Sequence, residues 1–440
     1  MLRLLVIALL IFNIGGCTQS ENSNGVERIG DVEALFESRS NVGINNLSLV
    51  NEPHGTAMIS FLNGNSDGVI RSRYFTPTNG WESVTNVFEG SHYEKPKTIF
   101  NSSGIAFAVA LRWDPGGSGI RHVWANRFIP GQGWGEQEKI SSHTYGNAYN
   151  PDISACPNGD IVIVWHWYDL ESQNGNVWSS RHTESTGWDA PVKISLDNQV
   201  LIWEPKVACD SLGNCSAVWT QNDTNDVGSI WSNRFSASTG WYSSENISAS
   251  SNDNYHPNLV VGKKDDALCV WSERNEYSSY GLWVNKYIIN SGWEKAQQIG
   301  TNFNQTPSVA VLNPIDDDNV LVTWNLDDAI WSVEYNAKSG WEQPFVIVQD
   351  GNFAHFSFND SRGILTWVNN ETIYGRKITL ETLTNDDVYL LDEKSENNFS
   401  RDPVATTLPD GSSIVCWIKT NGLSHYDSNY THYVYASHVE

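Results

Sequence analysis

Residues able to do acid–base chemistry gather in short segments between predicted strands. His166 and Tyr168 lie in one such segment, and Arg274 lies in another. A histidine, a tyrosine and an arginine on one face could neutralise a uronate carboxylate and abstract the adjacent α-proton, which is the chemistry of a polysaccharide lyase. No diagnostic spacing supports this set, and most charges in such segments are simply solvated.

A pair of carboxylates would allow a different reaction. Glu204 with either Asp169 or Glu273 could serve a glycosidase, provided that the separation of the two carboxyl groups matched a retaining or an inverting mechanism. Spacing along the chain does not define that separation, so this assignment stays open.

A third group of candidates combines aromatic rings with polar neighbours. Each pair precedes a recurring proline, and the polar residue differs from one copy to the next. Such rings can stack on the C–H faces of sugars while polar groups bind hydroxyls, although the same rings could instead pack neighbouring repeats together. The candidate ligand-binding residues of the first and third groups are Tyr93, Tyr149, Asn150, His166, Tyr168, Trp203, Glu204, Tyr255, His256 and Arg274.

Neither a metal site nor a cofactor site is predicted. The histidines are scattered without a His-x-x-x-His pair, and no Cys-x-x-Cys pair occurs. The sequence also lacks a glycine-rich phosphate loop and a nucleophile elbow. We therefore expect the protein to act without a metal or a cofactor.

The elements that must position these residues follow an internal repeat. The pair Gly-Trp recurs with steps of 48 to 54 residues, and a proline recurs with a similar spacing. Each proline is expected to open a short alternating strand, where it removes no ladder hydrogen bond. The tryptophans are Trp81, Trp134, Trp188, Trp241, Trp293 and Trp341, and the prolines are Pro96, Pro151, Pro205, Pro257 and Pro307.

Each repeat contains four short predicted strands. After the proline strand, a second strand commonly ends in tryptophan, as at Trp219, and a third alternates apolar and polar residues, as over Val123 to Phe128. The fourth follows Gly-Trp, as over Pro191 to Ile194. One such sheet cannot bury both faces, and repetition around an axis solves this problem. Because helical periodicity and linkers between repeats are both absent, we predict an all-β propeller of four-stranded antiparallel blades.

About eight blades are predicted, because eight third strands can be counted. The last unit ends with Tyr433 to Val439 and lacks a fourth strand, whereas Val32 to Glu37 resembles a fourth strand without a unit before it. Pairing of these two segments would close the ring and remove both exposed edges. Seven blades remain an alternative, since the divergent unit after Ser357 lacks both the proline and Gly-Trp.

Three motifs make the chain resemble secreted bacterial β-propeller repeat lipoproteins. They are Ala-Val-Trp ending at Trp219, Trp-Ala-Asn-Arg ending at Arg127, and Gly-Trp itself. The resemblance covers nearly all of the mature chain and implies the fold, not a chemistry. Sialidase-type repeats carry Ser-x-Asp-x-Gly-x-x-Trp boxes, but the nearest segment, Ser195 to Trp203, lacks the glycine and places the tryptophan one residue late.

The first residues have the pattern of a signal peptide. An apolar run from Leu4 to Ile14 is too short to span a bilayer, and two glycines and Cys17 follow it. This segment resembles the lipobox of bacterial lipoproteins, which implies that Cys17 becomes the lipid-carrying first residue. The membrane is thus an expected partner, through a lipid at Cys17.

The chain accordingly divides into three expected regions. We expect a signal peptide over residues 1–16, a flexible tether over 17–30 and the propeller over 31–440. Thr18 is not the aspartate that is associated with inner-membrane retention in some enteric bacteria. The expected location is therefore the bacterial cell envelope, with the outer membrane preferred.

The composition excludes one class of partner and disfavours another. The formal net charge is −24, so the surface is acidic and lacks the Lys/Arg clusters that bind phosphates, and no nucleic-acid partner is expected. Polyanionic polysaccharides would also be repelled at long range, although screening beyond about 10 Å leaves room for local basic pockets. Neutral ligands are expected to fit more easily.

Five cysteines follow Cys17, so at least one thiol should be unpaired in a monomer. Cys209 and Cys215 flank a predicted hairpin, where a disulfide is allowed in an oxidising compartment. The other three are expected to be small buried hydrophobic residues, and they are Cys156, Cys269 and Cys416.

Three functions fit these observations. The leading hypothesis is a membrane-anchored, extracytoplasmic module that recognises a glycan or a protein on the face around the central channel. One alternative is a carbohydrate-active enzyme, either a lyase or a glycosidase, and another is an assembly scaffold without a small ligand. We expect binding rather than catalysis.

Overall fold

The chain is all-β in the computed structural model. The structure describes residues 27–28, 31–39, 42–64, 67–114, 116–117, 119–143, 145–196, 201–262, 265–303, 308–314, 319–336, 338–359, 362–379, 388–395, 398–421 and 431–440. The regular elements in these ranges are β-strands, which confirms the all-β prediction. None of these residues belongs to a helix with the length and apolarity of a membrane span. Cys17 and the expected signal peptide lie outside the described residues.

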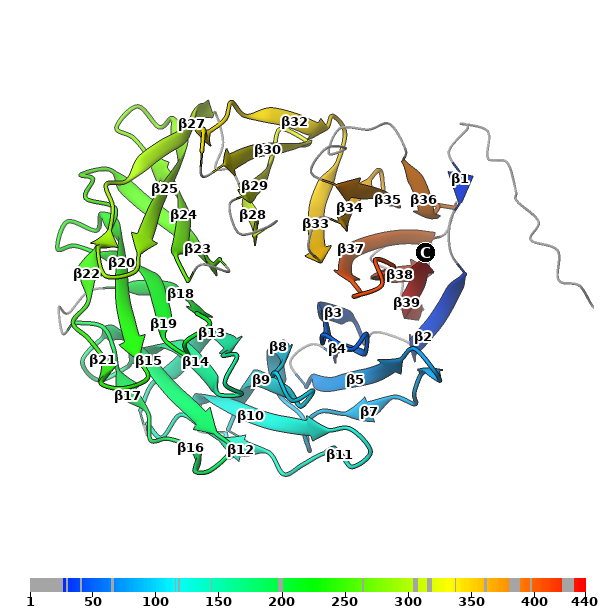
Figure 1. Cartoon of the computed structure of the whole chain (residues 1–440). Helices are drawn as coiled ribbons and strands as arrows, with labels where there is room; N and C mark the ends of the chain where they lie inside the picture. The colour runs from blue at the N-terminus through cyan, green and yellow to red at the C-terminus, as the bar shows by residue number, and fades with distance from the viewer. Residues whose placement is uncertain are drawn as a thin grey trace, which may run out of the picture.

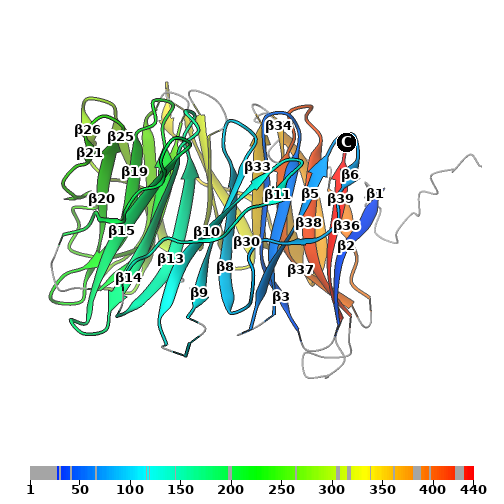
Figure 2. The same cartoon turned by 90° about the horizontal axis from the view of Figure 1, so that it is seen from below.

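The strands group into repeated antiparallel units, each with an inner, a second, a third and one or two outer strands. In the described ranges, six sheets hold one unit each, and a ten-stranded sheet holds two units joined by the parallel pairing of Arg121 with Asn147. The units are numbered 1 to 8 in chain order. They form a ring with the inner strands toward its centre (Figure 1). Neighbouring strands run side by side across the thickness of the ring (Figure 2).

The inner and second strands are long and regular. The inner strands of units 1 to 8 are β3 (Ile44–Asn51), β8 (Tyr93–Phe100), β13 (Asn147–Ala155), β18 (Ile202–Cys209), β23 (Asp253–Val261), β28 (Ser308–Pro314), β33 (Asn352–Asn359) and β37 (Asn398–Thr407). The second strands are β4 (Ala57–Asn63), β9 (Ala106–Trp113), β14 (Ile161–Asp169), β19 (Cys215–Asn222), β24 (Ala267–Arg274), β29 (Asn319–Leu326), β34 (Arg362–Asn369) and β38 (Ser413–Asn421).

The third strands lie toward the rim and the outer strands cover them. The third strands are β5 (Val69–Thr76), β10 (Arg121–Ile129), β15 (Asn174–Thr183), β20 (Gly228–Ser236), β25 (Tyr280–Ile288), β30 (Ala329–Asn336), β35 (Thr372–Thr379) and β39 (Thr431–Val439). The outer strands of units 1 to 7 are β6 (Gly80–Trp81), β7 (Thr85–Asn86), β11 (Gly133–Trp134), β12 (Glu138–Lys139), β16 (Gly187–Trp188), β17 (Val192–Lys193), β21 (Gly240–Trp241), β22 (Glu245–Asn246), β26 (Gly292–Trp293), β27 (Gln297–Phe303), β31 (Gly340–Trp341), β32 (Phe345–Val348) and β36 (Tyr389–Asp392).

The second strands are buried on both faces because each unit packs between two neighbours. In β4, β9 and β14 the first six residues are all buried. A strand that is covered on both sides needs a continuous apolar run, which these segments have. The tryptophans near the ends of these strands are fully buried, including Trp165, Trp219, Trp271, Trp324 and Trp417. They are packing residues of the fold.

The Gly-Trp pair joins the third strand to the outer edge of each unit. The glycine adopts positive φ, for example 68° at Gly80 and 84° at Gly240, a region that non-glycine residues enter at a cost. The tryptophan then packs on the last aromatic ring of the third strand, with centroids 5.3 Å apart for Phe75 and Trp81 and 5.5 Å apart for Phe235 and Trp241. In each Gly-Trp pair, the glycine therefore forms the turn, and the tryptophan packs the outer strand against the third strand.

The asparagine of the third-strand motif links neighbouring units. Asn126 Nδ2 donates to Val87 O at 2.7 Å, and Asn233 Nδ2 donates to Ile194 O at 2.8 Å. In both cases the accepting carbonyl belongs to the preceding unit. These bonds satisfy a buried polar group on each side of the interface, which explains why the motif repeats.

The inner strands carry a β-bulge that was not predicted. The pairing register shifts between Glu94 and Lys97 in β8 and at the matching positions of β13, β18 and β23. The residue before the proline has positive φ, with values from 45° to 56° at Lys95, Asn150, Glu204 and His256. We expected the proline to open the strand, but this prediction was wrong. The proline lies at the bulge, where it also removes no ladder hydrogen bond.

The N-terminal segment contributes strands to two sheets. β2 (Val32–Arg39) pairs antiparallel with β39, in the sheet order β2-β39-β38-β37. β1 (Glu27–Arg28) pairs parallel with β36 of unit 7, although these two residues fall in the range expected to be a tether. The first and last units are also in contact, since Arg401 Nη2 donates to Ile44 O at 2.8 Å. The divergent unit 7 also has an inner, a second, a third and an outer strand, in the order β33-β34-β35-β36.

Candidate functional site

The predicted site residues lie at one edge of the ring, which we call the front edge. At this edge the inner strands begin, the second strands end and the third strands begin. In unit 3, Tyr149 of β13 lies opposite His166 of β14, and His166 lies opposite Val177 of β15. In unit 2, Arg121 of β10 lies opposite Trp113 of β9. We expected the aromatic–polar pairs to lie in loops before the inner strands, but the structure places them within these strands.

Five planar side chains form a continuous row across units 2, 3 and 4. The Arg121 guanidinium lies 4.9 Å from the ring centroid of Trp113 and 4.1 Å from that of Tyr149. The Tyr149 ring stacks on His166 with centroids 5.4 Å apart, and His166 meets Trp203 edge-on at 5.9 Å. Trp113 and Trp203, at the two ends, are 37% and 43% exposed. We call these five residues the planar row.

Arg121 is fixed in the row by hydrogen bonds. The residue is 8% exposed, Nη1 lies 3.0 Å from Glu94 Oε1, and Nε donates to Ala148 O at 2.9 Å. The same Glu94 oxygen accepts a hydrogen bond from Trp113 Nε1 at 2.7 Å. The guanidinium is therefore neutralised and held rigid, and it acts as a platform between two rings.

His166 is buried without a hydrogen-bond partner. It is 2% exposed, and neither ring nitrogen has a partner among the described residues. Burial, together with the nearby charge of Arg121, lowers the pKa of His166 to about 3, so the ring is neutral at physiological pH. Gly175 makes room for it, since a Cβ there would lie 2.9 Å from His166 Nε2. The ring serves as a flat, uncharged surface.

Polar residues at the bulges extend the site toward the centre of the ring. Lys95 Nζ donates to Asn150 Oδ1 at 2.8 Å, between units 2 and 3. His256 Nδ1 lies 2.7 Å from Glu204 Oε2, between units 4 and 5. The hydrogen bond to Glu204 raises the pKa of His256 above its ordinary value, although burial opposes this. The first contact links the predicted Asn150 to unit 2, and the second links the predicted residues Glu204 of unit 4 and His256 of unit 5.

Four of the predicted residues lie apart from the planar row or at its margin. Tyr93 is 1% exposed and stacks on Phe88 at 4.8 Å, so it is a packing residue of unit 2 and not a ligand contact. Tyr168 meets His166 edge-on at 6.4 Å, and Tyr255 meets His256 edge-on at 5.2 Å. Arg274 Nη2 lies 3.2 Å from Asp253 Oδ2, at the end of β24.

The carboxylates considered for a glycosidase have other contacts. Asp169 Oδ1 accepts hydrogen bonds from the backbone of Glu171 and Ser172, which fixes its own turn. Glu273 is 5% exposed, and its Oε1 accepts a bond from Asn252 at 2.9 Å. Glu204 is held by His256. Each of these carboxylates is thus held by a group other than the second carboxylate of its candidate pair, and we do not propose a glycosidase.

Sequence reasoning missed Arg121 and a second cluster of histidines. Arg121 precedes the predicted third strand of unit 2, and its register opposite Trp113 is the signal that could have identified it. His143 stacks on Trp167 of β14 with centroids 4.4 Å apart, and His122 of β10 stacks on the same tryptophan at 5.9 Å. Their contacts join units 2 and 3 over a long separation in sequence, so no local pattern reveals them.

Three cysteines meet between units 3 and 4. Cys209 and Cys215 form a disulfide, and Cys156 Sγ lies 3.6 Å from Cys215 Sγ. Cys156, Cys269 and Cys416 are buried free thiols. Burial, with a contribution from the charge of Asp160, raises the pKa of Cys156 to about 12, so its thiol stays protonated.

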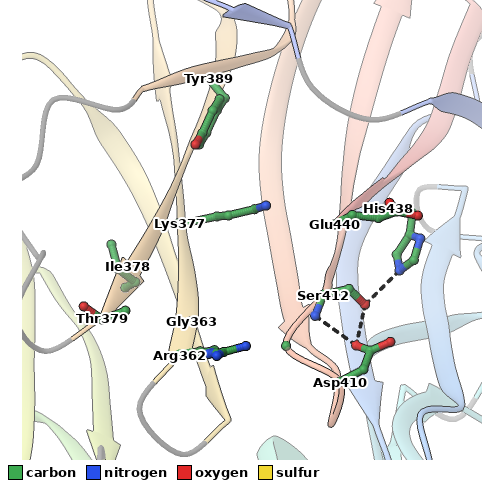
Figure 3. A pocket seen from close by; sticks show the side chains of 11 residues that line it. Arg362, Gly363, Lys377, Ile378, Thr379, Tyr389, Asp410, Ser412, His438 and Glu440 are labelled. Atoms are coloured by element: carbon green, nitrogen blue, oxygen red, sulfur yellow. Dashed lines mark hydrogen bonds between the residues drawn. The ribbon is translucent and has the colours of Figure 1, made fainter.

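A pocket of about 620 Å³ lies at the opposite edge, between units 7 and 8 (Figure 3). Arg362 and Lys377 lie on one side of it, and Asp410, Ser412 and His438 on the other. Ser412 Oγ donates to Asp410 Oδ1 at 2.6 Å and lies 2.9 Å from His438 Nε2. Because Asp410 already accepts the hydroxyl proton, this trio is not arranged as a nucleophile with its base. No residue of the planar row lines this pocket.

Comparison with known proteins supports the fold. No protein-family model and no curated protein sequence matches the chain. Among solved structures, a PL25 polysaccharide lyase, an ulvan lyase, aligns with a TM-score of 0.50 and 10% identity over 81% of this chain and 95% of its own. Prolyl oligopeptidase B from Galerina marginata aligns with a TM-score of 0.50 and 12% identity over 88% of this chain and 57% of its own. This chain is thus an all-β protein of antiparallel sheets with propeller-like structural neighbours. At such low identity the likeness concerns the fold alone.

Proposed function

We propose that this protein is a glycan-binding module and that the planar row is its binding surface. The observation that carries the proposal is the pair of exposed tryptophans, Trp113 and Trp203, joined by stacked planar groups. Sugar rings present flat C–H faces that stack on aromatic rings, and the hydroxyl groups between them need polar partners. Asn150 and Glu204, next in sequence to Tyr149 and Trp203, supply such partners.

Rigidity supports recognition as the role of this surface. Arg121 is held by Glu94 and by the Ala148 carbonyl, and His166 is enclosed by its neighbours. A site whose side chains are already immobilised loses little conformational entropy on binding. Scattered exposed aromatics are normal on protein surfaces, but here two of them end a row that crosses three units.

The test replaces the tryptophans one at a time. The unmodified protein is screened on a glycan array, and binding of the best ligand is measured by calorimetry in Trp113→Ala and Trp203→Ala. We expect each substitution to weaken binding about tenfold or more, because each removes one stacking platform. Tyr242→Ala is the matched control, since Tyr242 is 56% exposed and lies beside the outer strand β21. Unchanged affinity in both tryptophan variants would overturn the proposal, and absence of any glycan ligand would favour a scaffold.

A polysaccharide lyase is the second candidate, because an arginine, a tyrosine and a histidine lie in contact in the row. A solved ulvan lyase is also a structural neighbour. In this reaction Arg121 would neutralise the uronate carboxylate, and a base would take the C5 proton. The electron pair of that C–H bond would form the C4–C5 double bond, and the C4–O bond would break, with its oxygen taking up a proton.

Two features favour binding over this reaction. The charge of Arg121 is already engaged by Glu94, and a pKa of about 3 makes His166 a weak base. The release of unsaturated sugar ends from uronate polymers separates the two functions. Turnover that is abolished in His166→Ala, with binding retained, would favour the lyase. Loss of binding in Trp203→Ala, without turnover in the parent protein, favours the binding module.

We further infer that the protein is a lipoprotein of the bacterial cell envelope, anchored through Cys17, with the outer membrane preferred. The support is the apolar run from Leu4 to Ile14, followed by two glycines and the cysteine. Metabolic labelling with palmitate should mark the wild-type protein and not Cys17→Ser. Labelling that survives this substitution would contradict the inference.

We also infer that the ring is an eight-bladed propeller that β2 closes. The support is the pairing of β2 with β39 and the contact of the first and last units through Arg401 and Ile44. The shared edge of neighbouring blades then becomes a fixed platform for the planar row.

A further inference from the structure

The inner wall of units 2 to 5 reverses the charge of the molecule. The chain has 51 acidic residues against 27 lysines and arginines. At the bulges of β8, β13, β18 and β23 and two residues further along, the fixed charges are three cations and two anions, and a histidine is added to them. They are Lys95, Lys97, Lys206, Asp152, Glu204 and His256. An acidic protein thus presents a locally cationic wall beside the planar row.

Asp152 is fully engaged within this wall. Its Oδ1 forms an ion pair with Lys97, and its Oδ2 accepts a hydrogen bond from Val207 N at 2.9 Å. Burial disfavours the charge of Asp152, but Lys97 and Lys206 outweigh this effect and hold its pKa below the ordinary value. The charge of this one carboxylate is therefore shared between two lysines.

Lys206 experiences the surplus of positive charge. The charge of Lys97 and burial together lower the pKa of Lys206, while Asp152 and Glu204 oppose this shift. Two ammonium groups that compete for one carboxylate are stabilised by any further anion that approaches them. The side chain is half-buried, so it remains within reach of solvent and of a ligand.

Lys95 lies above this pair, nearer the front edge, and it is exposed. Its Nζ donates to the neutral amide of Asn150 at 2.8 Å, so this contact leaves its charge uncompensated. Glu204, the other acidic group nearby, is bound by His256 at 2.7 Å. Burial raises the pKa of Glu204, but His256, Lys206 and Lys95 together lower it further than burial raises it, which places both lysines close to this carboxylate.

We propose that the glycan bound at the planar row is acidic, and that its carboxylate or sulfate group sits against Lys95, Lys97 and Lys206, the inner cation cluster. This inference rests on the proposed glycan-binding function. Sequence continuity joins the two surfaces, because Asn150 follows Tyr149 and Lys206 follows Trp203 by three residues. Sugar rings stacked on the row would direct an acidic substituent toward the centre of the ring. Long-range repulsion by the acidic surface is compensated at this point by local, less screened attraction.

The test compares matched pairs of oligosaccharides on the full protein. The probes are oligogalacturonate with its methyl ester, and a sulfated oligosaccharide with its desulfated form. We expect the acidic member of a pair to bind about tenfold more tightly than the neutral member, since a charge-assisted hydrogen bond replaces a neutral one. In Lys95→Gln and Lys206→Gln this preference should disappear, while binding of the neutral member is retained.

Lys295→Gln is the matched control, because Lys295 is an exposed lysine beside β26, outside the inner wall, and its replacement changes the net charge equally. The outcomes separate the two proposals. Neutral probes that bind as tightly as acidic ones, or a preference that survives both lysine substitutions, would overturn the acidic-ligand inference and leave glycan binding intact. Failure of every acidic and neutral probe to bind would overturn both.

Discussion

At His166, burial decides the protonation state and thereby the role of the side chain. A histidine with an acidic partner commonly titrates near neutral pH, but His166 has no hydrogen-bond partner among the described residues and is 2% exposed. Its pKa of about 3 keeps it uncharged beside the cation of Arg121. The planar row therefore keeps one positive charge, which Glu94 neutralises, and the stacking surface stays apolar.

This protonation state makes stability depend on pH. The folded protein binds the His166 proton only near pH 3, whereas the unfolded chain binds it near the ordinary value of 6.5. The unfolded state thus holds more protons between these values, so stability is complete above about pH 6.5 and falls as the pH drops toward 3. His166→Gln should flatten this slope by about 1.4 kcal/mol per pH unit. Urea unfolding between pH 7 and 4 measures it.

His256→Gln is the control for that series. Its pKa is raised, so below the ordinary value of 6.5 it is protonated in both states, and its replacement should leave the slope unchanged at pH values above those at which its partner Glu204 titrates. An equal slope in wild type and His166→Gln would show that His166 titrates normally in the folded protein, and its assignment as a neutral stacking ring would then be wrong.

Gly175 tests the close approach beneath His166. A Cβ at this position would lie 2.9 Å from His166 Nε2 and 3.1 Å from the backbone nitrogen of Ile202. Gly175→Ala should destabilise the fold by about 1 to 3 kcal/mol, because the histidine or the neighbouring strand must shift. It should also weaken glycan binding, since His166 supports both Tyr149 and Trp203. Gly116→Ala, at a site with nothing within 4 Å, should change neither quantity. Thermal unfolding and calorimetry provide the two measurements.

The candidate residues were predictable only where a local pattern marks them. Tyr149, Trp203 and Glu204 stand before recurring prolines, so sequence analysis identified them. Arg121 was missed because its contacts, with Trp113 and Tyr149, depend on cross-strand register and on packing between units 2 and 3. Tyr93 lies three residues before its proline, whereas Tyr149 lies two residues before its own, so Tyr93 falls on the opposite face of its strand and is buried against Phe88. An offset of one residue thus changes which face of a strand a side chain occupies, and the looser aromatic–polar pattern did not register that offset.

At the level of elements, the repeat predicted the strands but not the irregularity within them. Alternation and the Gly-Trp pair gave the third and outer strands, as in β10 and β11. The inner-strand bulge escaped because Lys95, Glu204 and His256 adopt positive φ, a conformation that is uncommon for such residues. This bulge sets the orientation of the polar side chains of the inner wall. Sequence reasoning had placed these residues in a loop, so it missed the element that positions the charges.

The strand β2 should contribute strongly to stability. Leu35 is 4% exposed and packs in the apolar core with Phe61 and Val434. Leu35→Ala should cost about 2 to 4 kcal/mol, because it leaves a cavity in the sheet where β2 pairs with β39. Val42→Ala, at a residue 37% exposed, should cost less than about 1 kcal/mol. A Leu35 variant as stable as the wild type in chemical unfolding would contradict a structural role for β2.

At the scale of the whole molecule, the period of the repeat and the absence of linkers predicted one all-β architecture. Net charge gave a less reliable guide to the ligand. A charge of −24 favours neutral partners when it is treated as uniform, but Lys97 and Lys206 lie on the inner strands β8 and β18 and both interact with a single Asp152 on β13. The distribution of charge depends on which strand faces of neighbouring units meet, and only the folded ring brings them together.

This distribution gives binding kinetics an unusual dependence on salt. The acidic surface repels an acidic glycan at distances where salt screens strongly, whereas the half-buried contact with Lys206 is screened much less. Raising the ionic strength from about 0.01 M to 0.15 M should therefore increase the association rate of an acidic oligosaccharide and raise its dissociation rate only modestly. The methyl-esterified probe carries no charge, so both of its rates should stay constant. Surface plasmon resonance over a salt series measures these rates, and an association rate that falls with salt would mean that the approach path is itself cationic.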